Sequence, residues 1–281
     1  MTSPVEMQTE QMNSNPQGGK IIAVCSPKGG IGRTTLTVNL AVALMKNNFT
    51  VSVLDGDFQF GDVNLAMDLK FSLTVKEVLE VLQSLDGPSL NNYLAVHESG
   101  VRVLSAPERP EFADLITNEA VNKILDVMIS QHDYVVVDTP VGLHEQSLRI
   151  LERADQVLVI TNLEMASLKN TKLYLETLDL LGLRSRVKII VNRANMDSVI
   201  KAEDAAKILA VPNPIYIPND FQICSQSINL GVPFVMKYAK SEVAKGVFKM
   251  AELISGGPSP SSKKAKKGHS PLSKLFSKKR S

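Results

Sequence analysis

The sequence predicts a doubly wound α/β fold in which a mostly parallel sheet lies between two layers of helices. Three observations predict it. Short runs of β-branched and aliphatic residues recur along the chain, helical patterns fall between most of them, and most runs are apolar on both faces. A strand that is apolar on both faces is typical of a parallel sheet, because helices cover each side of such a sheet.

The expected strands are the apolar runs Ile21–Cys25, Val51–Leu54, Val101–Leu104, Tyr134–Val137, Val157–Ile160, Val187–Val191 and Ile215–Ile217. The helices expected between them are Thr34–Lys46, Val75–Leu85, Glu119–Ser130, Glu145–Arg153, Ser167–Leu181 and Ala202–Leu209. Two more, near Phe221–Leu230 and Ser241–Ile254, would complete the domain. On the helix Ser167–Leu181, a stripe of four leucines at helical spacing is expected to face the core: Leu168, Leu175, Leu178 and Leu181.

Composition favours one large domain. The chain has 281 residues, of which 44% are hydrophobic and 21% charged, so it can bury a large core. We expect this domain to cover residues 20–255. Residues 1–19 and 256–270 are rich in Ser, Pro, Gly, Asn and Lys and are expected to be disordered. Residues 256–281 as a whole are expected to form a basic, flexible tail with a short amphipathic helix.

Several classes of protein are disfavoured. The two cysteines, Cys25 and Cys224, are far apart and predict neither a disulfide framework nor a zinc site, which fits a reducing cytoplasm. The four histidines show no metal-ligand spacing. No stretch offers the roughly 20 apolar residues that cross a bilayer, and the N-terminus lacks the apolar core of a signal peptide. A soluble or peripheral protein is therefore expected.

A glycine-rich turn, Ser26–Thr35, joins the first expected strand to the first expected helix. Its three glycines leave room for backbone N–H groups to converge on an anion at a helix N-terminus. Thr34 supplies a hydroxyl that can bind Mg²⁺, and Arg33 beside it supplies a cation for phosphate. The alternative is a plain strand-to-helix turn with incidental charges.

Three aspartates follow expected strands. Asp55 and Asp57 come after Val51–Leu54, and Asp138 ends Tyr134–Val137. In a parallel sheet the carboxyl ends of the strands face one crevice, so these carboxylates are expected beside the glycine-rich turn, where they could hold a metal and position water. Any one of them could instead be a helix or turn cap. The loop after Asp57 could respond to a γ-phosphate or be a simple connection.

These motifs resemble those of the MinD/ParA family of P-loop ATPases. Residues 28–35 (KGGIGRTT) are similar to the family's deviant Walker A motif, 54–57 (LDGD) to its second acidic motif, and 133–140 (DYVVVDTP) to its Walker B motif. Residues 191–193 (VNR) and 217–220 (IPND) look like its adenine-recognition segments. The resemblance extends over about residues 20–254.

The resemblance implies an ATP·Mg²⁺-binding homodimer. Thr34, Asp55 and Asp138 would hold the metal, and Asp57 would orient the attacking water. Lys28 would reach the nucleotide of the partner subunit. The residues implied to bind nucleotide are Lys28, Gly29, Gly30, Ile31, Gly32, Arg33, Thr34, Thr35, Asn192, Arg193, Pro218 and Asp220.

Within the family the chain most resembles the CpaE/TadZ branch of pilus-assembly proteins. The similar segments are 57–65 (DFQFGDVNL), 106–111 (APERPE), 138–146 (DTPVGLHEQ), 167–170 (SLKN) and 218–221 (PNDF). That branch implies a polar landmark that places a pilus or secretion machine, with an unidentified assembly protein as partner. The resemblance does not extend to the receiver-like N-terminal domain common in that branch.

Arg33 departs from the family pattern, which has lysine at this position. A guanidinium keeps the charge but is planar, larger and able to bind two acceptors. We expect ATP binding to be retained and hydrolysis to be slow and stimulated by a partner.

The C-terminal tail is basic, with eight Lys or Arg and no Asp or Glu in residues 256–281. Leu272, Leu275 and Phe276 would share one face of a short helix with lysines around it, which resembles in type the membrane-targeting helix of MinD. Such a tail could attach the dimer to the inner face of the cell membrane through anionic lipids. A solvated tail and a DNA-binding tail are the alternatives.

Three functions are therefore open. The first is an ATPase switch that positions a pilus, secretion or other membrane-associated machine. The second is a nucleotide-binding scaffold without effective hydrolysis. The third is a partition ATPase acting on DNA, and a flagellar-placement role in the same family is also open.

Overall fold

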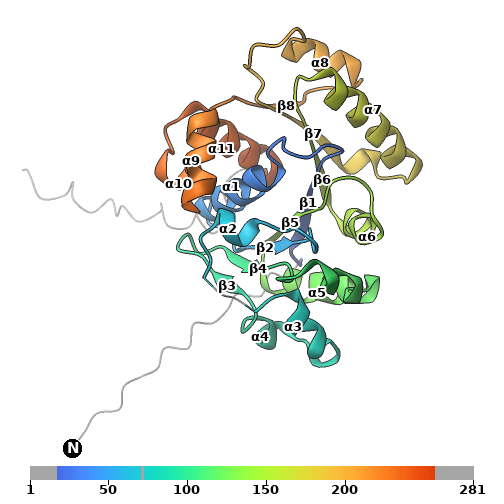
Figure 1. Ribbon diagram of the computed structural model, residues 1–281, viewed down its shortest axis with the longest axis vertical. Helices are drawn as coiled ribbons and strands as arrows, with labels where there is room; N and C mark the ends of the chain where they lie inside the picture. Colours follow the sequence, from blue (N-terminus) through green and yellow to red (C-terminus); the bar gives the residue numbers. More distant parts are fainter. Residues whose placement is uncertain (1–17, 71–72, 257–281) are drawn as a thin grey trace, which may run out of the picture.

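A single eight-stranded sheet forms the centre of the protein (Figure 1). The structure is a computed structural model and describes residues 18–70 and 73–256. The strand order is β3-β4-β2-β5-β1-β6-β7-β8, and every pair is parallel except β3–β4. The predicted α/β fold with a mostly parallel sheet is confirmed.

The strands are β1 (Lys20–Cys25), β2 (Val51–Asp55), β3 (Ala95–Val96), β4 (Arg102–Leu104), β5 (Tyr134–Asp138), β6 (Gln156–Thr161), β7 (Val187–Asn192) and β8 (Ile215–Ile217). All seven expected strands are present, with ends shifted by one residue at most. The sequence did not predict β3, because a two-residue edge strand carries no periodic pattern.

The helices are α1 (Arg33–Lys46), α2 (Val63–Ala66), α3 (Val75–Glu80), α4 (Gly87–Leu90), α5 (Asn118–Gln131), α6 (Glu145–Arg153), α7 (Met165–Leu180), α8 (Ala202–Ile208), α9 (Phe221–Leu230), α10 (Phe234–Lys237) and α11 (Glu242–Ser255). Short 3₁₀ turns lie at Leu82–Ser84, Pro110–Leu115 and Arg184–Arg186. The helix expected over Val75–Leu85 is shorter, since α3 ends at Glu80 and a 3₁₀ turn follows.

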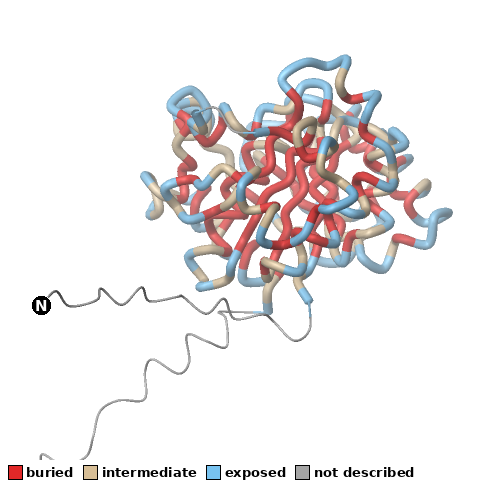
Figure 2. The backbone as a smooth tube through the Cα atoms, turned by 90° about the horizontal axis from the view of Figure 1, so that it is seen from below, coloured by how far each residue is buried: buried red, intermediate tan, exposed pale blue. Residues whose placement is uncertain are grey.

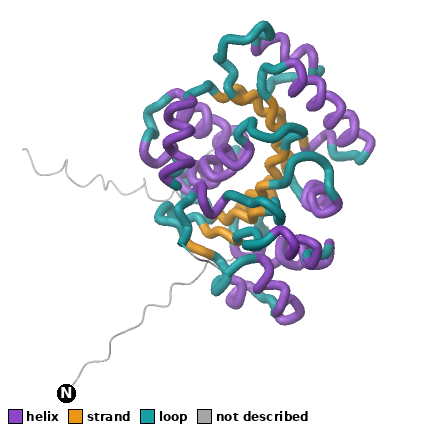
Figure 3. Tube along the Cα trace, viewed as in Figure 1, coloured by secondary structure: helices purple, strands orange, loops and turns teal. Residues whose placement is uncertain are grey.

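Two apolar cores lie on opposite faces of the sheet. Alternate residues of β1 point to opposite sides. Ile21 packs in the core beneath α5, α6 and α7, whereas Ile22 packs in the core beneath α1, α10 and α11. Figure 3 shows helices on both sides of the row of strands, and Figure 2 shows the buried strands at the centre. This three-layer arrangement explains why the strands are apolar throughout.

The order of the strands brings three loops together. The chain passes from β1 through α1 to β2, β5 inserts between β2 and β1, and β6 continues on the other side of β1. Such a reversal opens a crevice at the carboxyl ends of the strands. The loops after β1, β2 and β5 therefore border one place.

One predicted core residue lies at the surface. Leu168, Leu175 and Leu178 are buried, but Leu181 is 45% exposed, so that part of the prediction was wrong. The helix ends at Leu180, and Gly182 turns the chain with a φ of 72°. Leu183 is buried in its place.

Two of the expected segments lie outside the described residues. Nearly all of the expected N-terminal segment lies there, as do residues 257–281 with Leu272, Leu275 and Phe276. Among the helices in residues 18–70 and 73–256, none combines the length and apolar character needed to cross a bilayer.

Candidate functional site

The glycine-rich turn lies between β1 and α1, and α1 begins at Arg33. Gly30 and Gly32 have φ values of 72° and 92°, a region that L side chains rarely adopt. A Cβ on Gly32 would also lie 2.7 Å from Nδ2 of Asn192. Apart from Gly30 itself and its two neighbours in the chain, no atom of the described residues lies within 4 Å of a Cβ placed on Gly30. The turn therefore needs glycine and leaves open space at the N-terminus of a 14-residue helix, where an anion is stabilised.

Two residues at the end of β7 bind the carbonyl groups of this turn: Asn192 is the last residue of the strand and Arg193 follows it. Asn192 Nδ2 donates to the carbonyl oxygen of Ile31 at 2.8 Å, and Arg193 Nη2 donates to that of Gly30 at 3.2 Å. Asn192 Oδ1 accepts the backbone N–H of Arg193, whose φ is 55°. Asn192 and Arg193 were expected to bind the adenine base, and in the structure they also contact the turn directly.

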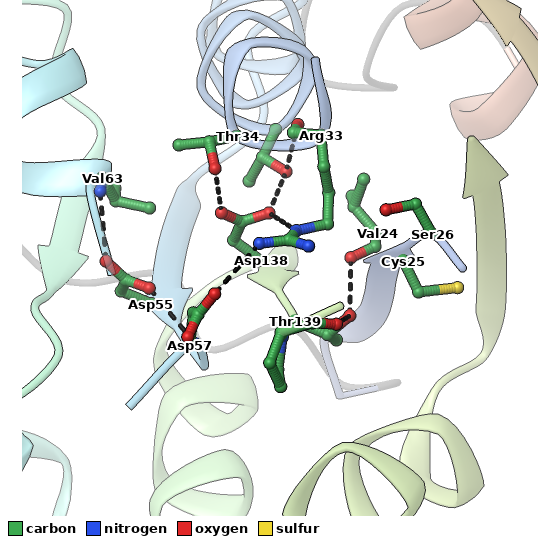
Figure 4. Close-up of polar contacts among 12 residues, drawn as sticks. Val24, Cys25, Ser26, Arg33, Thr34, Asp55, Asp57, Val63, Asp138 and Thr139 are labelled. Atoms are coloured by element: carbon green, nitrogen blue, oxygen red, sulfur yellow. Dashed lines mark hydrogen bonds and ion pairs between the residues drawn. The ribbon is translucent and has the colours of Figure 1, made fainter. Parts of the chain in front are cut away.

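Asp138, at the end of β5, is the centre of a hydrogen-bond cluster below the turn (Figure 4). Its Oδ2 accepts from Thr34 Oγ1 at 2.6 Å, and its Oδ1 accepts from Arg33 Nε and from Thr37 Oγ1, both at 3.1 Å. Burial raises the pKa of Asp138, while the charge of Arg33 and the donated hydrogen bonds oppose that rise. Thr37 was missed by the sequence analysis, although it lies one turn after Thr34 on α1.

Arg33 also reaches Asp57. Its Nη2 lies 3.1 Å from Oδ2 of Asp57. The Arg33 side chain is 11% exposed, that of Asp57 17% and that of Asp138 1%. One guanidinium thus joins the loop after β2 to the end of β5, and two of the three aspartates expected beside the turn, Asp57 and Asp138, contact it there.

Asp55 faces a different set of donors. It lies opposite Asp138 in the β2–β5 register, but its Oδ1 accepts from the backbone N–H of Asp57 at 3.3 Å and its Oδ2 from that of Val63 at 3.1 Å. A Cβ on Gly61 would lie 2.3 Å from Oδ2. Burial, followed by the charge of Asp138, raises the pKa of Asp55 well above its ordinary value. Asp55 therefore holds the loop 56–63 in place through two backbone N–H groups. These hydrogen bonds were not part of its expected role as a metal ligand.

The donors at the turn fit a magnesium ion that is shared with phosphate. A hydroxyl and a carboxylate, on Thr34 and Asp138, lie side by side, and Mg²⁺ prefers such oxygen ligands. The part of the chain that the structure describes contains no group of three or more His, Cys, Asp or Glu arranged to hold a metal. Mg²⁺ commonly takes one or two carboxylates and completes its shell with substrate phosphates and water. The residues present fit that pattern.

A cavity of about 200 Å³ adjoins the turn. Its walls come from Gly32 and Thr35 on one side and from the ends of β7 and β8 and helix α9 on the other. All four residues expected to bind the base line it: Asn192, Arg193, Pro218 and Asp220. Asp220 also caps α9 by accepting from the backbone N–H of Ile223 at 3.0 Å. Apolar and amide side chains together suit a flat heterocycle.

Lys28 lies at the surface beside the turn. Its ammonium group pairs with the carboxylate of Glu164, which precedes α7 in the same chain. The hydrogen bond from Lys28 is the main cause that lowers the pKa of Glu164. The side chains of Lys28 and Glu164 are 37% and 56% exposed, so both are accessible to a second molecule.

Cys25, at the end of β1, is buried, and burial raises its pKa to about 12. A thiol with that pKa is a poor nucleophile. Its packing role, which the sequence analysis preferred, agrees with this environment.

Comparison with known proteins agrees with the geometry. Residues 19–191 match the family model AAA_31, an AAA domain. The septum site-determining protein MinD of Synechocystis is 26% identical over 247 residues, which cover 86% of this chain and 91% of that protein.

Two solved structures share the fold. A ParA family ATPase from Chlorobium tepidum superposes with a TM-score of 0.78 at 23% identity, covering 83% of this chain and 98% of that one. MinD from Pyrococcus horikoshii, in complex with Mg-ADP, has a TM-score of 0.74 at 23% identity, covering 84% and 96%. At these identities the structures show the fold alone. Because the family model matches more than half of its length, the chain belongs to the AAA_31 family and is a MinD/ParA-type P-loop ATPase.

Proposed function

We propose that this protein is an ATP-dependent dimeric switch that positions a membrane-associated machine. The observation that supports it most is the meeting of the glycine-rich turn, the Thr34–Asp138 pair and Asp57 in one crevice, next to a cavity lined by residues of β7 and α9. The fold shared with a MinD that binds Mg-ADP favours an adenine nucleotide with magnesium as the ligand.

Each residue has a proposed task. The backbone N–H groups of residues 29–35 and the Arg33 guanidinium would bind phosphate oxygens. Thr34 and Asp138 would hold Mg²⁺, which neutralises developing phosphate charge. Asp57 would orient the attacking water, and Lys28 would stabilise phosphate charge in the partner subunit. Asp55 would act through the loop 56–63 that it fixes.

Slow hydrolysis is part of this proposal. Arg33 pairs with Asp57, the residue proposed to orient water, and this pair must open before Asp57 can do so. The same contact favours a second candidate, a nucleotide-binding scaffold without effective hydrolysis. Phosphate release distinguishes the two.

The test starts from purified full-length protein. Titration calorimetry with ATP and Mg²⁺ should detect binding, and steady-state phosphate release should be measurable. Asp57→Ala should abolish release while leaving nucleotide affinity within about threefold, because Asp57 lies beyond the phosphate-binding N–H groups. Turnover unchanged in Asp57→Ala would disprove its role, and no affinity for adenine nucleotides would disprove the whole proposal.

The cellular role is proposed on the sequence. The segments that resemble the CpaE/TadZ branch favour placement of a pilus or secretion machine, and the MinD relative, a septum site-determining protein, favours a positioning role in general. An unidentified assembly protein would be the partner. DNA partition and flagellar placement are alternatives within the family.

The basic tail provides the proposed attachment to the inner face of the cell membrane. Sedimentation with anionic vesicles should retain the ATP-bound protein, and replacing Leu272, Leu275 and Phe276 by serine should release it. Parallel sedimentation with DNA tests the alternative, which needs only the basic side chains. Vesicle binding that survives the serine variant would exclude the apolar anchor.

A further inference from the structure

Arg33 makes ion pairs with two aspartates that come from different strands. Nε of Arg33 lies 3.1 Å from Asp138 Oδ1, at the end of β5, and Nη2 lies 3.1 Å from Asp57 Oδ2, in the loop after β2 (Figure 4). The two pairs use different nitrogens of one planar group. Arg33 thus links the start of α1 to the loop 56–63.

The two aspartates depend on Arg33 to different extents. Asp138 also accepts from Thr34 and Thr37, so its carboxylate keeps two hydroxyl donors if the guanidinium turns away. Asp57 accepts from Arg33 through Oδ2, and through Oδ1 it accepts the backbone N–H of Phe60 at 3.4 Å. Loss of Arg33 therefore removes the cation that holds Asp57.

Asp57 in turn belongs to a loop whose two ends are fixed. The Asp55 carboxylate accepts from the backbone N–H groups of Asp57 and Val63. Between these points, Phe58 is buried, whereas Phe60 is 72% exposed. A change at Asp57 is thereby confined to the short exposed segment that contains Phe60.

A phosphate bound at the glycine-rich turn would compete for the same guanidinium. We propose that Arg33 is a positioning residue that couples occupancy of the turn to the loop 56–63, by holding Asp57 when the turn is empty and releasing it when phosphate draws the guanidinium away. This inference rests on the proposed function, because it requires a phosphate-bearing ligand.

The geometry requires arginine and not only a positive charge. A guanidinium presents several N–H donors in a rigid plane, so it can serve two carboxylates at once. An ammonium group carries its three N–H donors on one nitrogen, so both carboxylates would have to approach a single atom, whereas Asp138 and Asp57 lie against two different nitrogens, Nε and Nη2. Arg33→Lys should therefore keep the positive charge that attracts phosphate and lose the simultaneous pairing with Asp57 and Asp138.

The experiment follows hydrogen–deuterium exchange of the amides in residues 57–63 in the full-length protein. In nucleotide-free protein, Arg33→Lys and Asp57→Asn should each speed exchange roughly twofold to fivefold, the range for a partly exposed ion pair. The double variant should show no further increase, because both changes remove one contact. A non-hydrolysable ATP analogue with Mg²⁺ should raise exchange in the wild type and produce little change in the variants.

Arg153→Lys is the matched control. Arg153 pairs with Asp126, which joins α6 to α5, so the same chemical change at this site should leave exchange in residues 57–63 at the wild-type level. If Arg33→Lys does not fold, as judged by thermal melting, Asp57→Asn alone decides the result.

Affinity for the ATP analogue, measured on the same samples, separates this inference from the proposed function. If the wild-type protein binds the analogue but the nucleotide-free variants exchange no faster than the wild type, the coupling is overturned and the proposed function is left intact. Additive effects in the double variant would also overturn it. Wild-type protein that binds no adenine nucleotide would overturn both.

Discussion

Two aspartates at matching positions of neighbouring strands have different surroundings. Asp55 and Asp138 are partners in the β2–β5 register, and both are buried. Asp138 receives hydrogen bonds from side chains of α1, whereas Asp55 receives them from the backbone of its own loop. Residue type and position along the strand are the same, so the difference comes from which donors lie opposite.

The raised pKa of Asp55 predicts a pH dependence of stability. Its pKa is above the ordinary value of 3.8, so above pH 3.8 the folded protein binds more protons than the unfolded chain until the folded pKa is passed. In that window the free energy of unfolding falls as pH rises, by up to about 1.4 kcal/mol per pH unit for one proton. Asp55→Asn removes this proton, so its stability relative to the wild type should increase with pH.

Urea denaturation of both proteins from pH 4 upward, in EDTA, would measure this difference. Comparing the two proteins cancels the titration of all other groups that the substitution does not affect. A stability difference that stays flat across the range would show that Asp55 keeps its ordinary pKa.

Thr34 allows a test of magnesium binding without a change of charge. Thr34→Ala should weaken binding of ATP with Mg²⁺ by roughly tenfold to a hundredfold, the range for a hydrogen bond or ligand to a charged group. Affinity in EDTA should change little. Thr34→Ser keeps the hydroxyl, so its ATP affinity should differ between Mg²⁺ and EDTA by as much as that of the wild type. Equal losses with and without Mg²⁺ would place the role of Thr34 outside the metal site.

At the scale of elements, the predictions succeeded where a pattern is long. The buried strands and the helices α1, α5, α6, α7, α9 and α11 are periodic over many residues, and their positions were predicted closely. The two-residue strand β3 and the four-residue helices α2, α4 and α10 are too short to show a period. They form because neighbouring elements supply their partners.

The candidate site divides in the same way. That Arg33, Thr34, Asp57 and Asp138 meet could be predicted, because parallel strands end at one edge. The hydrogen bonds from Asn192 and Arg193 to the carbonyl groups of the turn could not be predicted. They depend on how β7 packs against a segment about 160 residues away in the sequence. The double pairing of Arg33 also depends on side-chain direction, which no spacing encodes.

Two glycines permit a matched test of the turn. Gly182, after α7, has a φ of 72° and open space around a Cβ, so Gly182→Ala should cost only the backbone strain of about 1 kcal/mol. Gly32→Ala adds a contact with Nδ2 of Asn192 and disrupts its hydrogen bond to Ile31, about 1 kcal/mol more. Thermal or urea denaturation measures both. If both variants lose the same free energy of unfolding, the contact between the new Cβ at residue 32 and Asn192 costs nothing.

At the scale of the whole molecule, the exposed Lys28 predicts a nucleotide-dependent assembly. Mass in solution, measured by light scattering, should double on addition of ATP with Mg²⁺ at concentrations that saturate binding. Lys28→Ala should keep nucleotide binding by one subunit but remain monomeric, because the cross-subunit contact with phosphate is lost.

Lys245→Ala is the control for that experiment. Lys245 pairs with Glu242 on the surface of α11, so its removal deletes a comparable exposed ion pair. This variant should assemble as the wild type does. A wild-type mass that does not change with nucleotide, or full assembly of Lys28→Ala, would contradict the proposed dimer.

The hold that β7 exerts on the glycine-rich turn has a thermodynamic consequence. Because Asn192 and Arg193 already engage two carbonyl groups of the turn, its peptide dipoles are oriented by the folded protein itself. Such preorganisation moves the entropy of ordering from the binding step into folding. A triphosphate would then meet a rigid cradle, and nucleotide association should show only a small conformational penalty.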